Sequence, residues 1–210
     1  SLEKHIQDSH DRLLTALRFS LIANYIDVGV DGEFDWESAL SQEKAEEKMG
    51  GYSKFRRLLD AGRPQVMILG DNAGEIGMDT LLVKQLKTLG VEVTYVVREK
   101  PILNDATMED AKFVGMDRLC RVISSGVDSP GTILSRCHPD FLQELHAGQI
   151  VISKGQGNFE SLHGRVTDIF FALKVKCPVV AGLTGFPVRT SVFDQLTAPP
   201  LTSDAQLDQV

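Results

Sequence analysis

Short apolar runs, each followed by a polar turn and an amphipathic segment, recur along most of the 210-residue chain. The run 66–69 is typical of a buried strand and too short for a helix. Apolar residues then recur at three- and four-residue steps from Ile76 to Leu89, which predicts a helix that stops near Gly90. The same reasoning predicts strands at 91–97, 119–123, 150–153, 169–173 and 179–181, and helices from about 107 to 114 and at 141–146.

The first third of the chain has a different pattern. Residues 1–28 and 52–60 follow a helical rhythm, 28–34 is rich in Gly and Asp turn signals, and 35–49 reads as a polar, acid-rich helix. We therefore expect three parts: a helical N-terminal region at 1–62, an α/β core at 63–197, and a disordered tail at 198–210. The chain starts inside a helical pattern, and we expect it to be part of a longer protein.

Strands that alternate with helical segments predict a mostly parallel, Rossmann-like sheet with helices on both faces, which is a three-layer α/β/α fold. Parallel strands bring their carboxyl ends to one edge, and ligands bind at that edge in open α/β sheets. Four of the predicted strands end in polar or glycine-rich turns, near Asp71, Asp105, Ser124 and Lys154. Their convergence predicts a single site.

Composition and charge narrow the functional classes. The net charge of −7 argues against a nucleic-acid-binding surface, and no apolar run has the length of a membrane span. The three cysteines are scattered, odd in number and without a CxxC pair. This indicates a protein of the cytoplasm with reduced cysteines and without a structural zinc site. No feature of the sequence indicates an oligomeric state.

The turn after the first predicted core strand carries Asp71 and Asn72, and Asp105 follows the next strand. Two carboxylates and an amide oxygen suit a hard divalent cation such as Mg²⁺ or Mn²⁺. The alternative is that Asp71 or Asn72 only caps the following helix. Sequence alone leaves these two interpretations about equally favoured.

Candidate phosphate-binding groups come from the two later turns. Lys154 supplies a compact positive charge, and glycine lets backbone N–H groups approach an anion closely. Phosphate contacts are expected from Ser124, Ser125, Gly126, Gly155 and Gly157. A cation beside phosphate donors, without a cofactor motif, is typical of phosphoester hydrolysis with an activated water.

Other chemistries lack their motifs. The chain has no Walker A sequence and no GxSxG elbow, and Ala73 replaces the second aspartate of haloacid-dehalogenase phosphatases. Asp27 or Glu75 is a candidate to take the proton from the attacking water. Asp71 as a nucleophile is the competing mechanism. Asn24 and Asp27 are three residues apart and share a helix face, although two solvated polar residues would show the same spacing.

Five segments resemble one known family. GDNAGEIGMD at 70–79, VREKPILNDATMEDA at 97–111, ISSGVDSPGT at 123–132 and KGQGNFESL at 154–162 are similar to the damage-control phosphatases, long called domain of unknown function 89. ANYID at 23–27 resembles the GN-x-x-D motif of that family, with Ala23 in place of glycine. The resemblance runs from about residue 12 to about residue 193 and is of the bacterial and archaeal type.

The resemblance implies an α/β/α metal-dependent phosphatase that acts on a small phosphorylated metabolite such as a sugar phosphate, with Mn²⁺, Mg²⁺, Co²⁺ or Ni²⁺. Asp71, Asn72 and Asp105 match the metal ligands, and Lys154 matches the phosphate-binding lysine. Groups that line the site match at Asn24, Asp27 and Asn158. The helical region of the family is longer than the one present here. A non-catalytic domain that binds metal and phosphometabolite is the alternative function.

Overall fold

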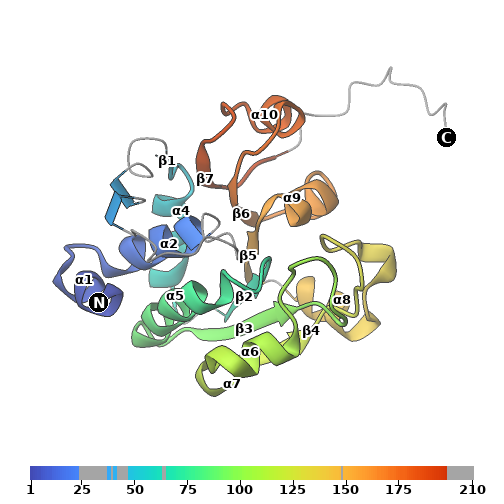
Figure 1. The fold of residues 1–210 in the computed structure, drawn as a ribbon, viewed down its shortest axis with the longest axis horizontal. Coiled ribbons are helices and arrows are strands. Elements are labelled where there is room, and N and C mark those ends of the chain that lie inside the picture. The colour runs from blue at the N-terminus through green and yellow to red at the C-terminus, as the bar shows by residue number, and fades with distance from the viewer. Residues whose placement is uncertain (24–36, 39, 42–46, 63–64, 148, 198–210) are drawn as a thin grey trace.

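The structure, a computed structural model, describes residues 1–23, 37–38, 40–41, 47–62, 65–147 and 149–197. A central sheet is covered by helices on both faces, which gives the predicted three-layer α/β/α fold (Figure 1). Its strands are β1 (Glu47–Lys48), β2 (Gln65–Leu69), β3 (Glu92–Val97), β4 (Arg121–Ser124), β5 (Ile150–Lys154), β6 (Ile169–Lys174) and β7 (Ser191–Asp194). The helices are α1 (Leu2–Asp8), α2 (Arg12–Ile22), α4 (Tyr52–Asp60), α5 (Ile76–Thr88), α6 (Met108–Val114), α7 (Met116–Leu119), α8 (Pro139–Leu145), α9 (Gln156–Leu162) and α10 (Pro178–Thr184), with a 3₁₀ turn at Leu134–Arg136.

The strands lie in the order β1-β7-β6-β5-β2-β3-β4. All neighbouring pairs are parallel except β6 and β7. From β2 the chain builds outward through β3 to β4, and it then returns to place β5 on the other side of β2. The connections after β2 and β5 therefore leave the sheet in opposite directions, and such a switch point opens a crevice at the carboxyl ends of the two strands.

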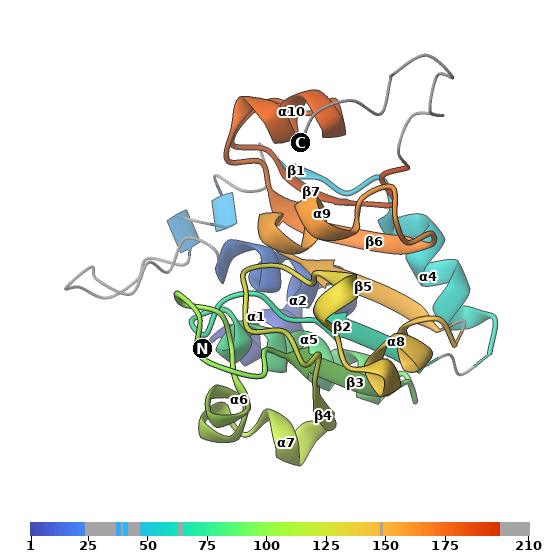
Figure 2. The ribbon, with the colours of Figure 1, turned by 90° about the vertical axis from the view of Figure 1, so that its right-hand side faces the viewer.

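Alternating strand residues supply two separate hydrophobic cores, because successive side chains of a strand point to opposite faces. Val66 and Ile68 of β2 pack in the core under α2, α4, α5 and α6, whereas Met67 and Leu69 pack in the core under α8, α9 and α10. Figure 2 shows the sheet between these two helical layers. Burial on both faces explains why β2 and β5 are continuous apolar runs in the sequence.

Most predicted core elements are confirmed with small shifts in their ends. Strands β2 to β6 and helices α4, α5, α6 and α8 lie where the sequence pattern placed them. The predicted strand at 179–181 is wrong. These residues belong to α10, which begins with Pro178 and ends at Gly185, a glycine in the left-handed conformation. Proline at a helix start and glycine just after its end outweigh the strand preference of two adjacent valines. The sequence pattern also missed β7 and α9.

The N-terminal segment does not form the single long helix that the sequence pattern predicted. Asp11 caps α2 by accepting a hydrogen bond from the Leu14 amide, so residues 1–22 form two helices. β1 lies inside the predicted acidic helix and pairs with β7, which brings the N-terminal region into the sheet. Asn24, Asp27 and the tail 198–210 lie outside the described residues, and the domain boundaries stay a prediction. No described helix combines the length and the hydropathy needed to cross a bilayer.

Candidate active site

The turns after β2 and β3 are joined at the carboxyl edge of the sheet, next to the switch point. Asn72 and Asp105 form an isolated antiparallel bridge, and the Ala106 amide donates to the Asp71 carbonyl at 2.7 Å. The Ala73 amide donates to the Asn104 carbonyl, also at 2.7 Å. These backbone bonds bring Asp71, Asn72 and Asp105 together, although 34 positions of sequence separate the outer two.

Asp71 is buried, with 9% of the residue exposed, and its carboxylate accepts no hydrogen bond within the described part of the chain. Burial, with the carboxylates of Glu75 and Asp105 nearby, raises the pKa of Asp71 to about 7. A buried carboxylate beside two others is costly unless a cation or a proton balances it. Asp71 is therefore the side chain of the site with the clearest need for a ligand.

The Asn72 amide and the Glu75 carboxylate are connected to Lys154 by hydrogen bonds. The Asn72 Nδ2 donates to Glu75 Oε1 at 2.8 Å, and the Lys154 ammonium donates to Glu75 Oε2 at 3.1 Å. The same ammonium donates to Asp79 Oδ1 at 2.7 Å and to the Ser20 carbonyl of α2 at 3.0 Å. Lys154 is fully buried. Burial opposes its charge, but Asp79 and Glu75 together raise its pKa above the ordinary range.

Three acceptors occupy the three N–H groups of this ammonium. A direct contact between Lys154 and a phosphate would have to replace one of them. Phosphate binding by Lys154 stays a prediction, and the structure adds that the lysine compensates the charge of two buried carboxylates.

Arg98 is the main site residue that sequence reasoning missed. Its Nε donates to Asp105 Oδ2 at 2.7 Å, and its two terminal nitrogens donate to Thr132 Oγ1 at 3.0 Å and to Asn158 Oδ1 at 2.9 Å. Arg98 is 3% exposed, so the ion pair with Asp105 is buried. It holds one oxygen of Asp105 and leaves Oδ1 available. Two sequence signals could have indicated it: its place directly after the strand 91–97, and its position inside the motif VREKPILNDATMEDA.

Asn158, predicted to line the site, is fully buried and fully bonded. Its Nδ2 donates to the carbonyls of Gly70 and Lys154 at 3.0 and 2.8 Å, and its Oδ1 accepts from Arg98 and Thr132. It thus joins the ends of β2 and β5 to the Arg98 side chain. In this arrangement Asn158 holds the two strand ends and Arg98 in place.

The predicted phosphate turns lie at the same edge with several groups already engaged. Ser125 donates to the Val97 carbonyl, and Ser124 Oγ accepts from the Gly126 amide at 3.0 Å. The Gly155 amide donates to the Ala172 carbonyl at 2.9 Å, so it is not free for an anion. Gly157 lies in the first turn of α9. Whether these groups contact phosphate stays a prediction.

The charges of the buried cluster do not balance. Among the described residues, with every group ionised, the four acidic groups Asp71, Glu75, Asp79 and Asp105 face the two basic groups Arg98 and Lys154. One divalent cation would compensate the excess of two negative charges. The described residues contain no group of three His, Cys, Asp or Glu side chains placed to hold a metal. Cation binding by Asp71, Asn72 and Asp105 stays a prediction, and their two carboxylates and one amide would supply oxygen ligands only.

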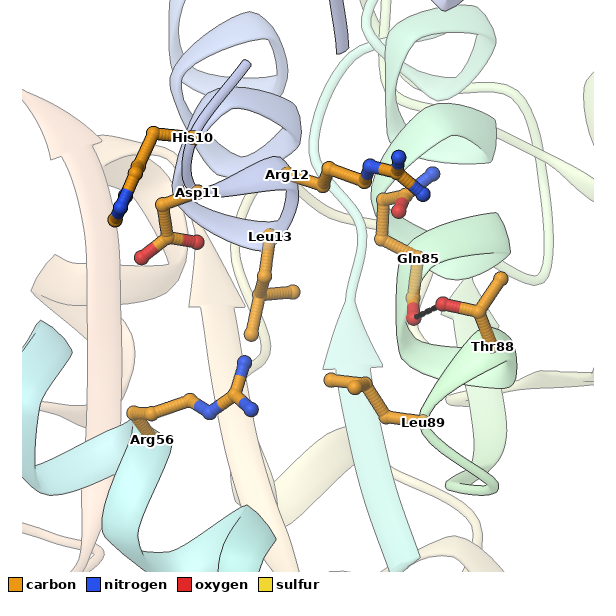
Figure 3. Close-up of a pocket in the computed structure, with 8 residues that line it drawn as sticks. All are labelled: His10, Asp11, Arg12, Leu13, Arg56, Gln85, Thr88 and Leu89. Atoms are coloured by element: carbon orange, nitrogen blue, oxygen red, sulfur yellow. Dashed lines mark hydrogen bonds between the residues drawn. The ribbon is translucent and has the colours of Figure 1, made fainter. Parts of the chain in front are cut away.

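A surface pocket lies at the opposite edge of the sheet, where α5 ends (Figure 3). Arg12 and Arg56 reach it from α2 and α4, and Gln85 and Thr88 reach it from α5. The 13 residues of α5 separate it from the Asp71 turn by roughly 20 Å. None of the predicted site residues lines this pocket.

A family model described as the damage-control phosphatase ARMT1-like domain matches residues 1–192. The chain belongs to the damage-control phosphatase family. The resemblance carried by the site motifs is thereby confirmed, and the motifs now coincide with the joined turns of β2, β3 and β5.

Three relatives are similar to this chain, and two of them are named as damage-control phosphatases. An uncharacterized protein of Methanocaldococcus jannaschii is 35% identical over 88% of this chain and 63% of its own length. Damage-control phosphatases of Pyrococcus horikoshii and Archaeoglobus fulgidus are 33% and 32% identical, over 79% and 89% of this chain and 59% and 66% of their own lengths. The chain thus spans about three fifths to two thirds of these relatives.

A crystal structure of a domain-of-unknown-function-89 protein from Pyrococcus horikoshii has the same fold. It superposes with a TM-score of 0.79 at 30% sequence identity, over 93% of this chain and 70% of the other. This likeness confirms the α/β fold predicted from the sequence.

Proposed function

We propose that this chain carries a phosphatase site that hydrolyses a small phosphorylated metabolite with the help of a divalent cation. Membership of the damage-control phosphatase family supports the reaction class. The buried Asp71 carboxylate accepts no hydrogen bond from the described residues and lies in a cluster where the described acidic groups outnumber the basic ones by two, which supports the cation. This carboxylate is the observation that carries the proposal.

Asp71, Asn72 and Asp105 would hold the cation through oxygen atoms. Once bound, a divalent cation supplies Lewis acidity at the phosphoester and helps a water molecule to attack. Because Glu75 only accepts hydrogen bonds when ionised, the amino group of Asn72 must face it, and Asn72 Oδ1 is left for the cation. Arg98 similarly engages Asp105 Oδ2 and leaves Oδ1.

With a cation bound, Arg98, Lys154 and that cation would together offset the carboxylates of the cluster, so an anionic substrate would meet no net repulsion at this edge. Burial also helps, because electrostatic interactions are stronger where water is excluded. We propose a sugar phosphate or a compound of similar size as the substrate. Mn²⁺, Mg²⁺, Co²⁺ and Ni²⁺ are the candidate cations.

The test is the release of inorganic phosphate from para-nitrophenyl phosphate by the metal-free chain, before and after addition of Mn²⁺, Co²⁺ or Ni²⁺. We expect activity only with a cation, and we expect Asp71→Asn and Asp105→Asn to remove it while the circular dichroism spectrum stays unchanged. A panel of sugar phosphates and nucleotides then identifies the preferred substrate class.

Calorimetric titration with Mn²⁺ separates the two functions that the sequence left open. A chain that binds Mn²⁺ and a sugar phosphate but releases no phosphate would be a non-catalytic binding domain. A chain whose activity is unchanged by chelation and by both substitutions would contradict the cation site itself.

A further inference from the structure

A continuous line of hydrogen bonds runs from the candidate cation site into the core. Asn72 Nδ2 donates to Glu75 Oε1 at 2.8 Å, and Glu75 Oε2 accepts from the Lys154 ammonium at 3.1 Å. That ammonium donates to Asp79 Oδ1 at 2.7 Å, and the Tyr95 hydroxyl donates to Asp79 Oδ2 at 2.7 Å. Glu75, Asp79, Tyr95 and Lys154 are each at most 1% exposed. We call this line the Tyr95–Asn72 relay.

Each member of the relay has little freedom to turn. Both oxygens of Asp79 are engaged. Oδ2 accepts from Tyr95, and Oδ1 accepts from Lys154 and also from Ser20 Oγ at 2.5 Å. Lys154 has its three N–H groups engaged. Glu75 uses one oxygen for Lys154 and the other for Asn72. A displacement at either end therefore has to be passed along, because leaving a hydrogen bond unmade in a buried site is costly.

The inner end of the relay, at Tyr95, is fixed by packing. Tyr95 belongs to β3, and its ring lies against Gly70 at the end of β2: a Cβ on Gly70 would be 2.8 Å from both the Tyr95 hydroxyl oxygen and Cε1. The neighbouring strand thus accepts this ring only because residue 70 has no side chain. This packing holds the Tyr95 hydroxyl next to Gly70, the residue before Asp71, where it donates to Asp79.

We propose that Tyr95 and Asp79 are positioning residues for the cation site, and that they act through Lys154 and Glu75 on the Asn72 amide. The inference rests on the proposed function, because Asn72 has to be a cation ligand for its orientation to matter. It extends that function to two residues that touch neither cation nor substrate. Loss of the Tyr95 hydroxyl removes a donor from Asp79, lets Asp79 and Lys154 shift, and loosens the Glu75 carboxylate that orients Asn72.

The test uses Tyr95→Phe, which keeps the ring and all formal charges. Tyr52→Phe is the matched control, because the Tyr52 hydroxyl also donates to a carboxylate, that of Asp11, far from the site. Mn²⁺ affinity is measured by calorimetry on the full chain, and the visible absorption of bound Co²⁺ reports on the ligand arrangement. We expect Tyr95→Phe to weaken Mn²⁺ binding by about 10-fold and to shift the Co²⁺ spectrum. Tyr52→Phe should change neither.

The absence of a charge change makes the result specific. If Asp79 served only to neutralise Lys154, Asp79→Asn would alter Mn²⁺ affinity and Tyr95→Phe would not. Equal affinity and equal Co²⁺ spectra for Tyr95→Phe and the unsubstituted chain overturn the relay and leave the proposed function standing. An unsubstituted chain that binds no Mn²⁺ overturns both. If circular dichroism shows Tyr95→Phe to be unfolded, Ser20→Ala removes a second donor to Asp79 and is judged by the same two measurements.

Discussion

The Asp71 carboxylate lies directly against the Cα of Gly155, where β5 ends. A Cβ built on Gly155 would be 1.9 Å from Asp71 Oδ2 and 2.1 Å from its Cγ, and Gly155 has a φ of +78° that other residues rarely adopt. The two strand ends that flank the switch point therefore approach each other at one carboxylate and one glycine. This close approach makes the position of Asp71 depend on residue 155.

The first prediction follows from this contact. We expect Gly155→Ala to push the Asp71 carboxylate out of place and to lower Mn²⁺-dependent phosphatase activity by at least about 100-fold, since a displacement of about 1 Å can already cost that much. Gly77→Ala is the control, because nothing lies within 4 Å of a Cβ there and it is inside α5. That change should keep activity and raise stability by about 0.5–1 kcal/mol. Equal activity of both variants would contradict the prediction.

The second prediction concerns pH. The pKa of Asp71 is raised from 3.8 to about 7 in the metal-free protein, so its contribution to stability is complete below about pH 4 and is lost as the pH rises through 7. We expect the unfolding temperature in chelator to fall between pH 5 and pH 8 by several degrees more than it does in Asp71→Asn. A loss of 1 kcal/mol corresponds to about 2–4 °C at this chain length.

The same titration predicts a larger effect of the cation at higher pH. Mn²⁺ competes with the proton at Asp71, so the rise of unfolding temperature on addition of Mn²⁺ should be greater at pH 8 than at pH 5. Parallel pH profiles for the unsubstituted chain and Asp71→Asn in chelator would show that Asp71 is not the group responsible.

The third prediction tests Arg98. Arg98→Lys keeps the charge next to Asp105, but a lysine cannot reproduce the three separate contacts of the guanidinium with Asp105, Thr132 and Asn158. We expect Mn²⁺ affinity to fall about 10- to 100-fold, as for other residues that orient a metal ligand. Arg136→Lys is the control, because its ion pair with Asp128 is exposed. Unchanged affinity in Arg98→Lys would mean that charge alone matters at this position.

The fourth prediction separates two roles of Lys154. Lys154→Ala leaves Glu75 and Asp79 buried without a counter-charge, and breaking such a pair costs about 3–5 kcal/mol. Urea unfolding should show that loss, whereas Arg121→Ala, which breaks the exposed pair with Glu144, should cost at most about 1 kcal/mol. Lys154→Arg should rescue poorly, because the enclosed site is shaped for an ammonium. Lost phosphate affinity at unchanged stability would instead make Lys154 a direct phosphate ligand.

Local sequence patterns predicted the strands that build the site, and the reason is physical. β2 and β5 are buried on both faces, so their apolar runs are nearly continuous, and the polar turns after β2, β3 and β5 stand out against the strands. The joined turns at Asp71 and Asp105 follow from parallel strands sharing one edge. The pattern failed at α10, where two valines suggested a strand, and at α9, where two glycines suggested a loop.

The buried charge network could not be read from the sequence, because its partners are far apart along the chain. Lys154 is 75 residues from Asp79 and 134 from Ser20, and Arg98 is 60 residues from Asn158. No periodicity or spacing indicates which distant charges will meet. Asp79 looked like an ordinary position in a helix, and Arg98 looked like the first residue of a loop.

The position of Lys154 late in the chain also has a consequence for synthesis on the ribosome. A nascent chain that has reached β4 already contains Glu75, Asp79 and Tyr95, but it lacks the ammonium that offsets their burial. If the half-sheet β2-β3-β4 packed without β5, Glu75 and Asp79 would lack the Lys154 ammonium that pairs with them in the complete fold. We therefore expect this half to stay loosely folded until β5 has been synthesised and pairs with β2. The arrival of Lys154 would then allow both halves of the sheet to fold together.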